Sequence, residues 1–251
     1  MEIEVINNIL NDEYYNLKYK VEEGIIVSIL GRNSIEETQL FDKIYKKIEK
    51  DKLFYLKQDY INSLFNINIL EDIKYNNHPV DEKKINDLLK FFNINDKVKS
   101  NYLELSEGEI KKALLVKLFA GNYKVILLDD PTSGLDDESI SKLIIQLKRE
   151  KRKGRIILIS SKNSEFINQV SDEIVLLNNC KNDKAEFINI HNPDIILRNT
   201  EILRELDMSM PEIIKFKILA ESKKIKLGKS NNINDLIKSI YRKTNEIRTK
   251  N

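Results

Sequence analysis

Two short segments of this chain combine residue types that suit phosphate and metal binding. In VILLDDPTSGLD (residues 125–136), an apolar run leads into Asp129 and Asp130. Such a run predicts a buried strand, and open α/β sheets bind ligands where their strands end. A hard carboxylate there suits a water-rich Mg²⁺ ion bound to phosphates. The two aspartates alone are equally typical of a polar turn, but the whole string favours a site.

The second segment, LSEGE (residues 105–109), opens a predicted helix. Ser106 is a favourable N-cap, and Gly108 lets the backbone approach a ligand closely. The N-terminus of a helix presents free N–H groups and a partial positive charge, which suit a phosphate. A plain capped helix explains these residues equally well in isolation. Because the segment stands shortly before Asp129, the pair of motifs favours a phosphate site.

The elements that position these segments alternate between strand and helix. Apolar runs predict buried strands, and stripes at helical spacing predict the helices between them. The strands are expected at residues 25–30, 125–130, 155–161 and 173–179, and the helices at 35–50 and 138–153. Continuous apolar strands alternating with helices predict an α/β fold whose mainly parallel sheet is covered on both faces.

Two other regions are predicted to be helical. Residues 59–101 are polar with a helical stripe, and we expect a helical insertion at about 59–115. Residues 193–251 are expected to form a small C-terminal helical region, with helices at 201–206, 211–224 and 234–247. Residues 1–192 then form the core. The histidines, His78 and His191, are interpreted as surface residues without a metal cluster.

Composition limits the function classes. Of the 251 residues, 41% are apolar and 33% are charged, which is typical of a globular protein. The 42 basic and 40 acidic residues give a formal charge of +2, so charge gives no reason to expect nucleic-acid binding. Cys180 is a single cysteine, which excludes an internal disulfide. No apolar run reaches the ~18 residues that span a bilayer, and no signal-peptide pattern is present, so any membrane role is expected to come through a partner.

The motifs resemble those of the ATP-binding-cassette (ABC) ATPase family. LSEGE looks like the family's signature motif, Asp129 and Asp130 like its Walker B region, SGLD like its D-loop, and Gln58 like its Q-loop glutamine. We call residues 105–109 the signature segment and residues 133–136 the D-loop segment. The resemblance implies a P-loop NTPase core that uses ATP and Mg²⁺. The metal ligands that it implies are Thr38, Gln58 and Asp129.

The stretch GRNSIEET (residues 31–38), here called the phosphate loop, departs from the family pattern G-x-x-x-x-G-K-[ST]. Glu36 replaces the second glycine and Glu37 replaces the lysine. A unit charge pair at 4 Å contributes about 4 kcal/mol at an effective dielectric near 20, so this reversal turns attraction into repulsion. Weak or no ATP hydrolysis is therefore expected at this site, and whether ATP still binds there stays open. The loop residues that match nucleotide-binding positions are Gly31, Asn33, Ser34, Glu37 and Thr38.

Two catalytic positions also differ from the family pattern. Asp130 stands where the family has a glutamate that polarises water, and Ser161 stands at the switch histidine. A serine cannot take over a histidine's sensing of a phosphate near neutral pH. Tyr14 and Tyr15 lie before the first core strand, and neither is assigned to stacking on adenine.

The departures fall on the chain's own nucleotide site, whereas the resemblance assigns Ser106, Gly108 and Asp136 to the site of a partner subunit. This pattern predicts the degenerate member of an ATPase heterodimer that completes an intact paralogue's ATP site. The C-terminal segment resembles that of energy-coupling factor (ECF) transporter ATPases, which implies an integral membrane transport component and a peripheral location on the cytoplasmic face. Two alternatives stay open: an active ATPase with an atypical phosphate loop, and a soluble ABC-like regulator.

Overall fold

A six-stranded sheet forms the centre of the computed structural model, which describes residues 1–11, 19–60, 68–75, 81–177, 190–223 and Leu236. The strand order is β2-β3-β4-β1-β5-β6, and every pairing except the last is parallel. The strands are β1 (Ile26–Gly31), β2 (Leu53–Leu56), β3 (Val125–Asp129), β4 (Ile156–Ser160), β5 (Glu173–Leu177) and β6 (Ile190–His191). The predicted α/β fold with a mainly parallel sheet is therefore confirmed.

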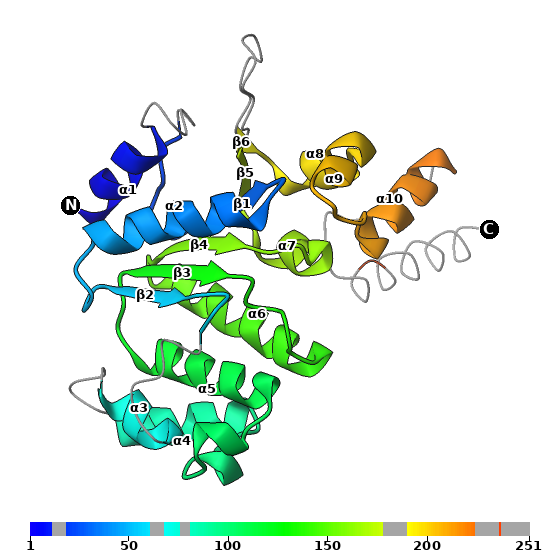
Figure 1. Cartoon of the computed structure of the whole chain (residues 1–251). Helices are drawn as coiled ribbons and strands as arrows, with labels where there is room; N and C mark the ends of the chain where they lie inside the picture. Colours follow the sequence, from blue (N-terminus) through cyan, green and yellow to red (C-terminus); the bar gives the residue numbers. More distant parts are fainter. Residues whose placement is uncertain (12–18, 61–67, 76–80, 178–189, 224–235, 237–251) are drawn as a thin grey trace, which may run out of the picture.

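Helices cover both faces of this sheet (Figure 1). Neighbouring strand residues point to opposite faces, so Val27 and Ile29 pack with helices α1 and α2, while Ile26 and Leu30 pack with the helices of the other face. The helices of the core are α1 (Glu2–Leu10), α2 (Ser34–Lys47), α6 (Asp137–Arg152) and α7 (Ser164–Val170). Burial on both faces explains why the strands are almost entirely apolar.

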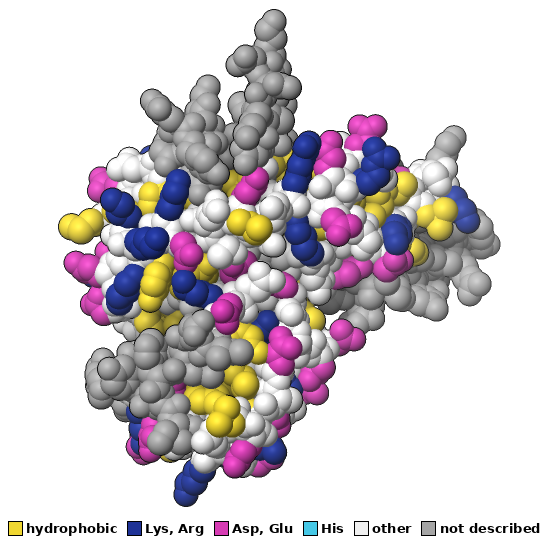
Figure 2. Space-filling view, in the orientation of Figure 1, with side chains coloured by type: hydrophobic (Ala, Val, Ile, Leu, Met, Phe, Trp, Pro, Cys, Tyr) yellow, Lys and Arg dark blue, Asp and Glu magenta, His cyan; other side chains and the backbone are white. Residues whose placement is uncertain are grey.

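The remaining helices form two groups beside the core (Figure 1). The helical region between β2 and β3 comprises α3 (Ile69–Tyr75), α4 (Glu82–Phe91), the 3-10 turns η2 (Asn95–Lys97) and η3 (Tyr102–Glu104), and α5 (Glu107–Ala120). The C-terminal group comprises α8 (Pro193–Arg198), α9 (Thr200–Glu205) and α10 (Glu212–Ser222). On the face shown in Figure 2, basic and acidic side chains are interspersed. Within the described ranges, no helix is both long and apolar enough to span a bilayer.

The structure adds elements that the sequence patterns did not predict: helices α1, α7 and α8, and strands β2 and β6. His191 was placed beyond the last core strand, but it lies in β6, opposite Ile174 of β5. Both missed strands are very short, which leaves too few residues for a periodic pattern. The predicted helix at 234–247, His78 and Cys180 lie outside the described residues, apart from Leu236. The domain boundaries at 59–115 and 192/193 stay predictions.

A buried ion pair joins two helices of the helical region. The Asp72 carboxylate of α3 lies 2.8 Å from the Lys117 ammonium of α5, and both side chains are buried. The Tyr102 hydroxyl donates a hydrogen bond of 3.3 Å to the same Asp72 oxygen. The loss of one partner leaves the other charge buried without its counter-ion, which is costly.

We predict that Lys117→Met lowers the free energy of unfolding by about 3–5 kcal/mol, because it removes one charge of this buried pair. The double change Asp72→Leu/Lys117→Met removes both charges and is expected to cost less. Urea denaturation of each variant measures the difference. Lys74→Met, which breaks an exposed pair with Glu82, is the control and should leave the midpoint nearly unchanged. Equal losses in the single and double variants would contradict the prediction.

Candidate functional site

The carboxyl ends of neighbouring strands bring a buried aspartate together with two hydroxyl groups. Asp129 ends β3, and its register partner Ser160 ends β4. The Ser160 hydroxyl donates to one Asp129 oxygen at 2.7 Å, and the Thr38 hydroxyl of α2 donates to the other at 2.5 Å. Burial raises the pKa of the Asp129 carboxyl, although both hydrogen bonds act in the opposite direction. The structure thus unites two of the three predicted metal ligands, Thr38 and Asp129.

Oxygen donors at this edge fit a hard cation that also binds phosphates. Asp129 offers a buried carboxylate beside the Thr38 hydroxyl, which is the kind of donor set that Mg²⁺ takes. Gln58 follows β2 at the same edge, but its side chain is exposed and makes no hydrogen bond to this pair within the described residues. No group of three or more His, Cys, Asp or Glu suited to a metal occurs in the described part of the chain. A Mg²⁺ ion held by Asp129 and Thr38 would complete its coordination with water or phosphate oxygens.

In the phosphate loop, backbone N–H groups already have partners within the chain. Asn33 caps α2: its side chain accepts from the Ile35 N–H, and its carbonyl accepts from the Glu36 N–H, both at 3.0 Å. The Gly31 N–H donates to the Glu37 carboxylate at 2.5 Å. Ser34 begins α2 and is half-buried. A loop that binds phosphate must direct such N–H groups at the ligand, so this conformation does not fit a bound phosphate.

Glu37 points into the protein rather than into solvent. Its side chain is only 2% exposed. Burial raises the pKa of Glu37 to about 7, against the lowering effects of the Gly31 N–H and of Lys162, whose ammonium lies 3.8 Å away. That Glu37 opposes phosphate binding at the lysine position stays a prediction, and the sequence pattern did not predict this burial. Arg32 is paired with Glu205 of α9 at 2.7 Å.

Asp130, the expected catalytic base, has two hydroxyl groups beside its carboxylate. Asp130 adopts a left-handed backbone with φ of 45°, which is unusual for a residue other than glycine. The hydroxyls of Ser161 and Thr132 each lie 3.3 Å from one of its carboxylate oxygens, and they lie 3.2 Å from each other. The structure therefore brings Ser161, at the predicted switch position, next to Asp130. Tyr14 and Tyr15 fall outside the described residues.

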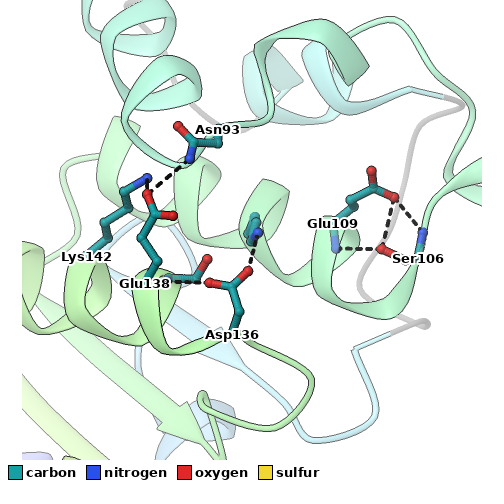
Figure 3. A network of polar contacts seen from close by, with 8 residues as sticks. Asn93, Ser106, Glu109, Asp136, Glu138 and Lys142 are labelled. Atoms are coloured by element: carbon teal, nitrogen blue, oxygen red, sulfur yellow. Dashed lines mark hydrogen bonds and ion pairs between the residues drawn. The ribbon is translucent and has the colours of Figure 1, made fainter.

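The signature segment begins α5 with a reciprocal capping arrangement (Figure 3). The Ser106 hydroxyl accepts the Glu109 N–H at 3.3 Å, and the Glu109 carboxylate accepts the Ser106 N–H at 2.8 Å and the Ser106 hydroxyl at 2.9 Å. The Ser106 N–H lowers the pKa of Glu109, which keeps it ionised. Ser106 is therefore the N-cap that the sequence predicted, but its polar groups are engaged by Glu109.

The D-loop segment leads into α6, and its Asp136 is the N-cap of that helix (Figure 3). The Asp136 carboxylate accepts the Ser139 N–H at 2.7 Å and lies 2.9 Å from the Lys112 ammonium of α5. The Ser139 N–H and then Lys112 hold the pKa of Asp136 down at about 2. In the same view, Glu138 of α6 accepts from Asn93, which follows α4, at 3.1 Å. These contacts join the helical region to the D-loop segment and α6.

Lys111 makes a further link between the two segments, and sequence reasoning missed it. This α5 side chain is buried, and its ammonium donates to the carbonyl of Ser133 at 2.6 Å and to that of Asp130 at 3.3 Å. Burial lowers the pKa of Lys111, whereas nearby Asp130 and Glu107 raise it. The one sequence signal was a lysine pair at 111–112 that directly precedes the apolar run 113–116.

Gly108 meets the D-loop segment at very close range. A Cβ atom at position 108 would lie 2.6 Å from the carbonyl oxygen of Gly134. The sequence predicted that Gly108 allows close approach to a ligand, whereas in the structure the close neighbour is the chain's own Gly134 carbonyl. Together with Lys111, this contact fixes the signature segment against the D-loop segment.

We predict that Gly108→Ala destabilises the chain by about 1–3 kcal/mol, because its methyl group must displace a backbone carbonyl. Chemical denaturation measures the loss. Glu104→Ala, on an exposed turn just before the signature segment, is the control and should change stability little. A Gly108→Ala variant as stable as the natural chain would show that the two segments do not pack this closely in solution.

Comparison with known proteins relates these features to a family. Residues 19–133 match the family model described as ABC transporter. A protein of Saccharolobus solfataricus that is named as an ABC transporter ATP-binding protein is 27% identical over 66% of this chain, and the chain spans 37% of that protein's length. The energy-coupling factor transporter ATP-binding protein of Methanothermobacter thermautotrophicus is 25% identical, over 78% of this chain and 70% of that protein.

A solved structure supports the fold. The protein cbiO1 of Clostridium perfringens, described as part of the ABC transporter complex cbiONQ, superposes with a TM-score of 0.56 at 20% identity, over 80% of this chain and 90% of that chain. At this identity the likeness concerns the fold alone. The match over residues 19–133 agrees with the resemblance drawn from the motifs. The parallel sheet with Asp129 at its edge has the P-loop NTPase fold, so the chain is similar to ABC transporter ATPases and shares their fold.

Proposed function

We propose that this chain is the degenerate-site nucleotide-binding subunit of an ECF-type uptake transporter. Its own phosphate loop has given up productive ATP binding, and its signature and D-loop segments complete the ATP site of an intact paralogous ATPase. Ser106, Gly108 and Asp136 are the residues that it contributes. ATP and Mg²⁺ are held chiefly by the partner's phosphate loop.

The contrast between the two sets of motifs carries this proposal. In the phosphate loop, the lysine position holds a buried glutamate that takes the Gly31 N–H. The signature and D-loop segments, in contrast, are held together by Lys111 and by the close approach of Gly108 to Gly134. A site that had lost all function would have no reason to keep this second arrangement.

Ser106 and Asp136 would act as preorganised groups at the ends of two helices. The N-terminus of α5 offers N–H groups and a favourable dipole for a phosphate, but its first turn also carries Glu107 and Glu109. Binding of a partner's phosphate would therefore require Glu109 to release Ser106. Gln58 and the helical region at about 59–115 would transmit closure to the membrane component.

We infer the partner proteins from similarity to ECF transporter ATPases, not from surface features of this chain. Similarity to an ECF transporter ATP-binding protein, and a C-terminal segment at 193–251 that resembles those ATPases, support docking beneath an integral membrane transport component. The chain would then be peripheral, on the cytoplasmic face. The core at 1–192 would supply the ATPase interface.

We predict that Ser106→Arg in the assembled pair lowers the ATPase rate about tenfold or more, because it puts a bulky side chain where the partner's phosphate must bind. Steady-state ATP hydrolysis by the purified complex is the measurement. Ser222→Arg, which adds the same side chain at the exposed end of α10, is the matched control. An unchanged ATPase rate in the Ser106→Arg complex would contradict the proposal that this chain completes the partner's ATP site.

The state of the chain's own site is tested separately. We expect the natural chain to show no saturable Mg-ATP binding, whereas Glu36→Gly/Glu37→Lys should gain affinity by about a hundredfold or more, since a charge reversal at the loop contributes several kcal/mol. Equilibrium titration of the purified chain with Mg-ATP measures this. Tight binding by the natural chain would instead favour a working ATPase with an atypical loop, with Asp129 on the metal and Asp130 as the base.

A further inference from the structure

A lysine from another element stands at the phosphate loop. Lys162 lies two residues beyond the end of β4, and its side chain is 36% exposed. Its ammonium donates to the Gly31 carbonyl at 2.6 Å and lies 3.8 Å from the Glu37 carboxylate. The positive charge that position 37 lacks is therefore present at the loop, supplied from the strand next to β1 in the sheet.

The Glu37 carboxylate makes the kinds of contact that a phosphate oxygen makes. It accepts a backbone N–H at the end of β1, and it faces an ammonium group. Carboxylates and phosphates share both preferences, because each is an oxyanion that binds charged and N–H donors. Glu37 thus satisfies the loop from within the chain.

Two other charged side chains near the loop, Arg32 and Asp129, have partners away from Glu37. Arg32 reaches outward to Glu205 of α9. Both oxygens of Asp129 are occupied by hydroxyls of Thr38 and Ser160. Among the cations in the described ranges, Lys162 is the one whose ammonium is paired with Glu37. Its partial exposure leaves it reachable by a ligand from solvent.

We propose that Lys162 is the phosphate-binding cation of this loop, and that the Glu37 carboxylate occupies the place of the phosphate. The ligand class is the di- or triphosphate of a nucleotide. The Glu37 carboxylate then blocks the phosphate site of the loop but leaves the site intact. Displacement of Glu37 exposes this site, whose positive charge comes from Lys162. This inference rests on the proposed loss of the chain's own site, but not on any partner subunit.

The alternative is a purely structural pair, in which Glu37 and Lys162 only join the loop to β4. The two cases differ when the carboxylate is neutralised without changing its shape. A structural pair would lose stability and gain no ligand. An internal stand-in for phosphate would gain affinity for phosphates, and that gain would require Lys162.

Isothermal titration of the purified full chain with inorganic pyrophosphate tests the proposal. We expect no saturable binding by the natural chain and clear binding by Glu37→Gln. Adding Lys162→Met should weaken that binding about tenfold or more, the factor expected for one lost charge-assisted hydrogen bond. Adding Lys47→Met instead, at the exposed end of α2, removes the same charge away from the loop and should leave the affinity of Glu37→Gln unchanged.

Two outcomes would overturn the proposal. One is a folded Glu37→Gln chain that binds pyrophosphate no better than the natural chain. The other is equal affinity with and without Lys162. Circular dichroism and thermal unfolding verify the fold, and Glu37→Ser serves as a second neutral variant if Glu37→Gln does not fold.

Chemical labelling gives an independent readout. Pyrophosphate should slow acetylation of Lys162, relative to Lys47, in the Glu37→Gln chain. Equal acetylation with and without pyrophosphate would count against Lys162 as the ligand-binding group. Because these measurements use the isolated chain, they can succeed or fail independently of the ATPase rate of the assembled complex.

Discussion

The carboxyl edge of the sheet depends on the hydrogen bonds that the buried carboxylate of Asp129 accepts. Hydroxyls from α2 and β4 converge on its two oxygens, so one side chain joins three elements at the carboxyl end of the sheet. A buried carboxylate is tolerated only when such donors satisfy it. Since Thr38 is held there, the first turn of α2 is fixed in orientation. Glu37, one residue earlier, is thereby directed beneath the phosphate loop instead of into solvent.

Local sequence signals were sufficient for the framework and for several site positions. The apolar run before Asp129 predicted its place at a strand end, and Ser106 was identifiable as a cap, because strand periodicity and helix capping involve only near neighbours. The short strands β2 and β6 gave no such pattern. The roles of Lys111 and Lys162 depend on which segments the fold brings together, and a lysine's partner cannot be inferred from its own neighbours in the chain.

The phosphate loop differs in its kind of order from the signature and D-loop segments. The phosphate loop is satisfied by Asn33 and Glu37, so its polar groups are directed inward. The signature and D-loop segments are positioned by contacts with each other, through Lys111 and Gly108. The first kind of order opposes a ligand. The second fixes the two segments relative to each other, although Glu109 still engages the N–H and hydroxyl of Ser106. This difference is the physical basis for assigning the chain a role at a partner's site.

The two buried lysines of α5 connect this helix to the D-loop segment and to α3. Lys111, near its start, is bonded to backbone carbonyls that precede and begin the D-loop segment, and Lys117, six positions later, is bonded to α3. Its 14 residues extend about 21 Å. A rigid rod anchored at both ends converts a small displacement at one end into a displacement at the other. A displacement of the D-loop segment would therefore move α5, and α5 would move α3 through the Lys117–Asp72 pair.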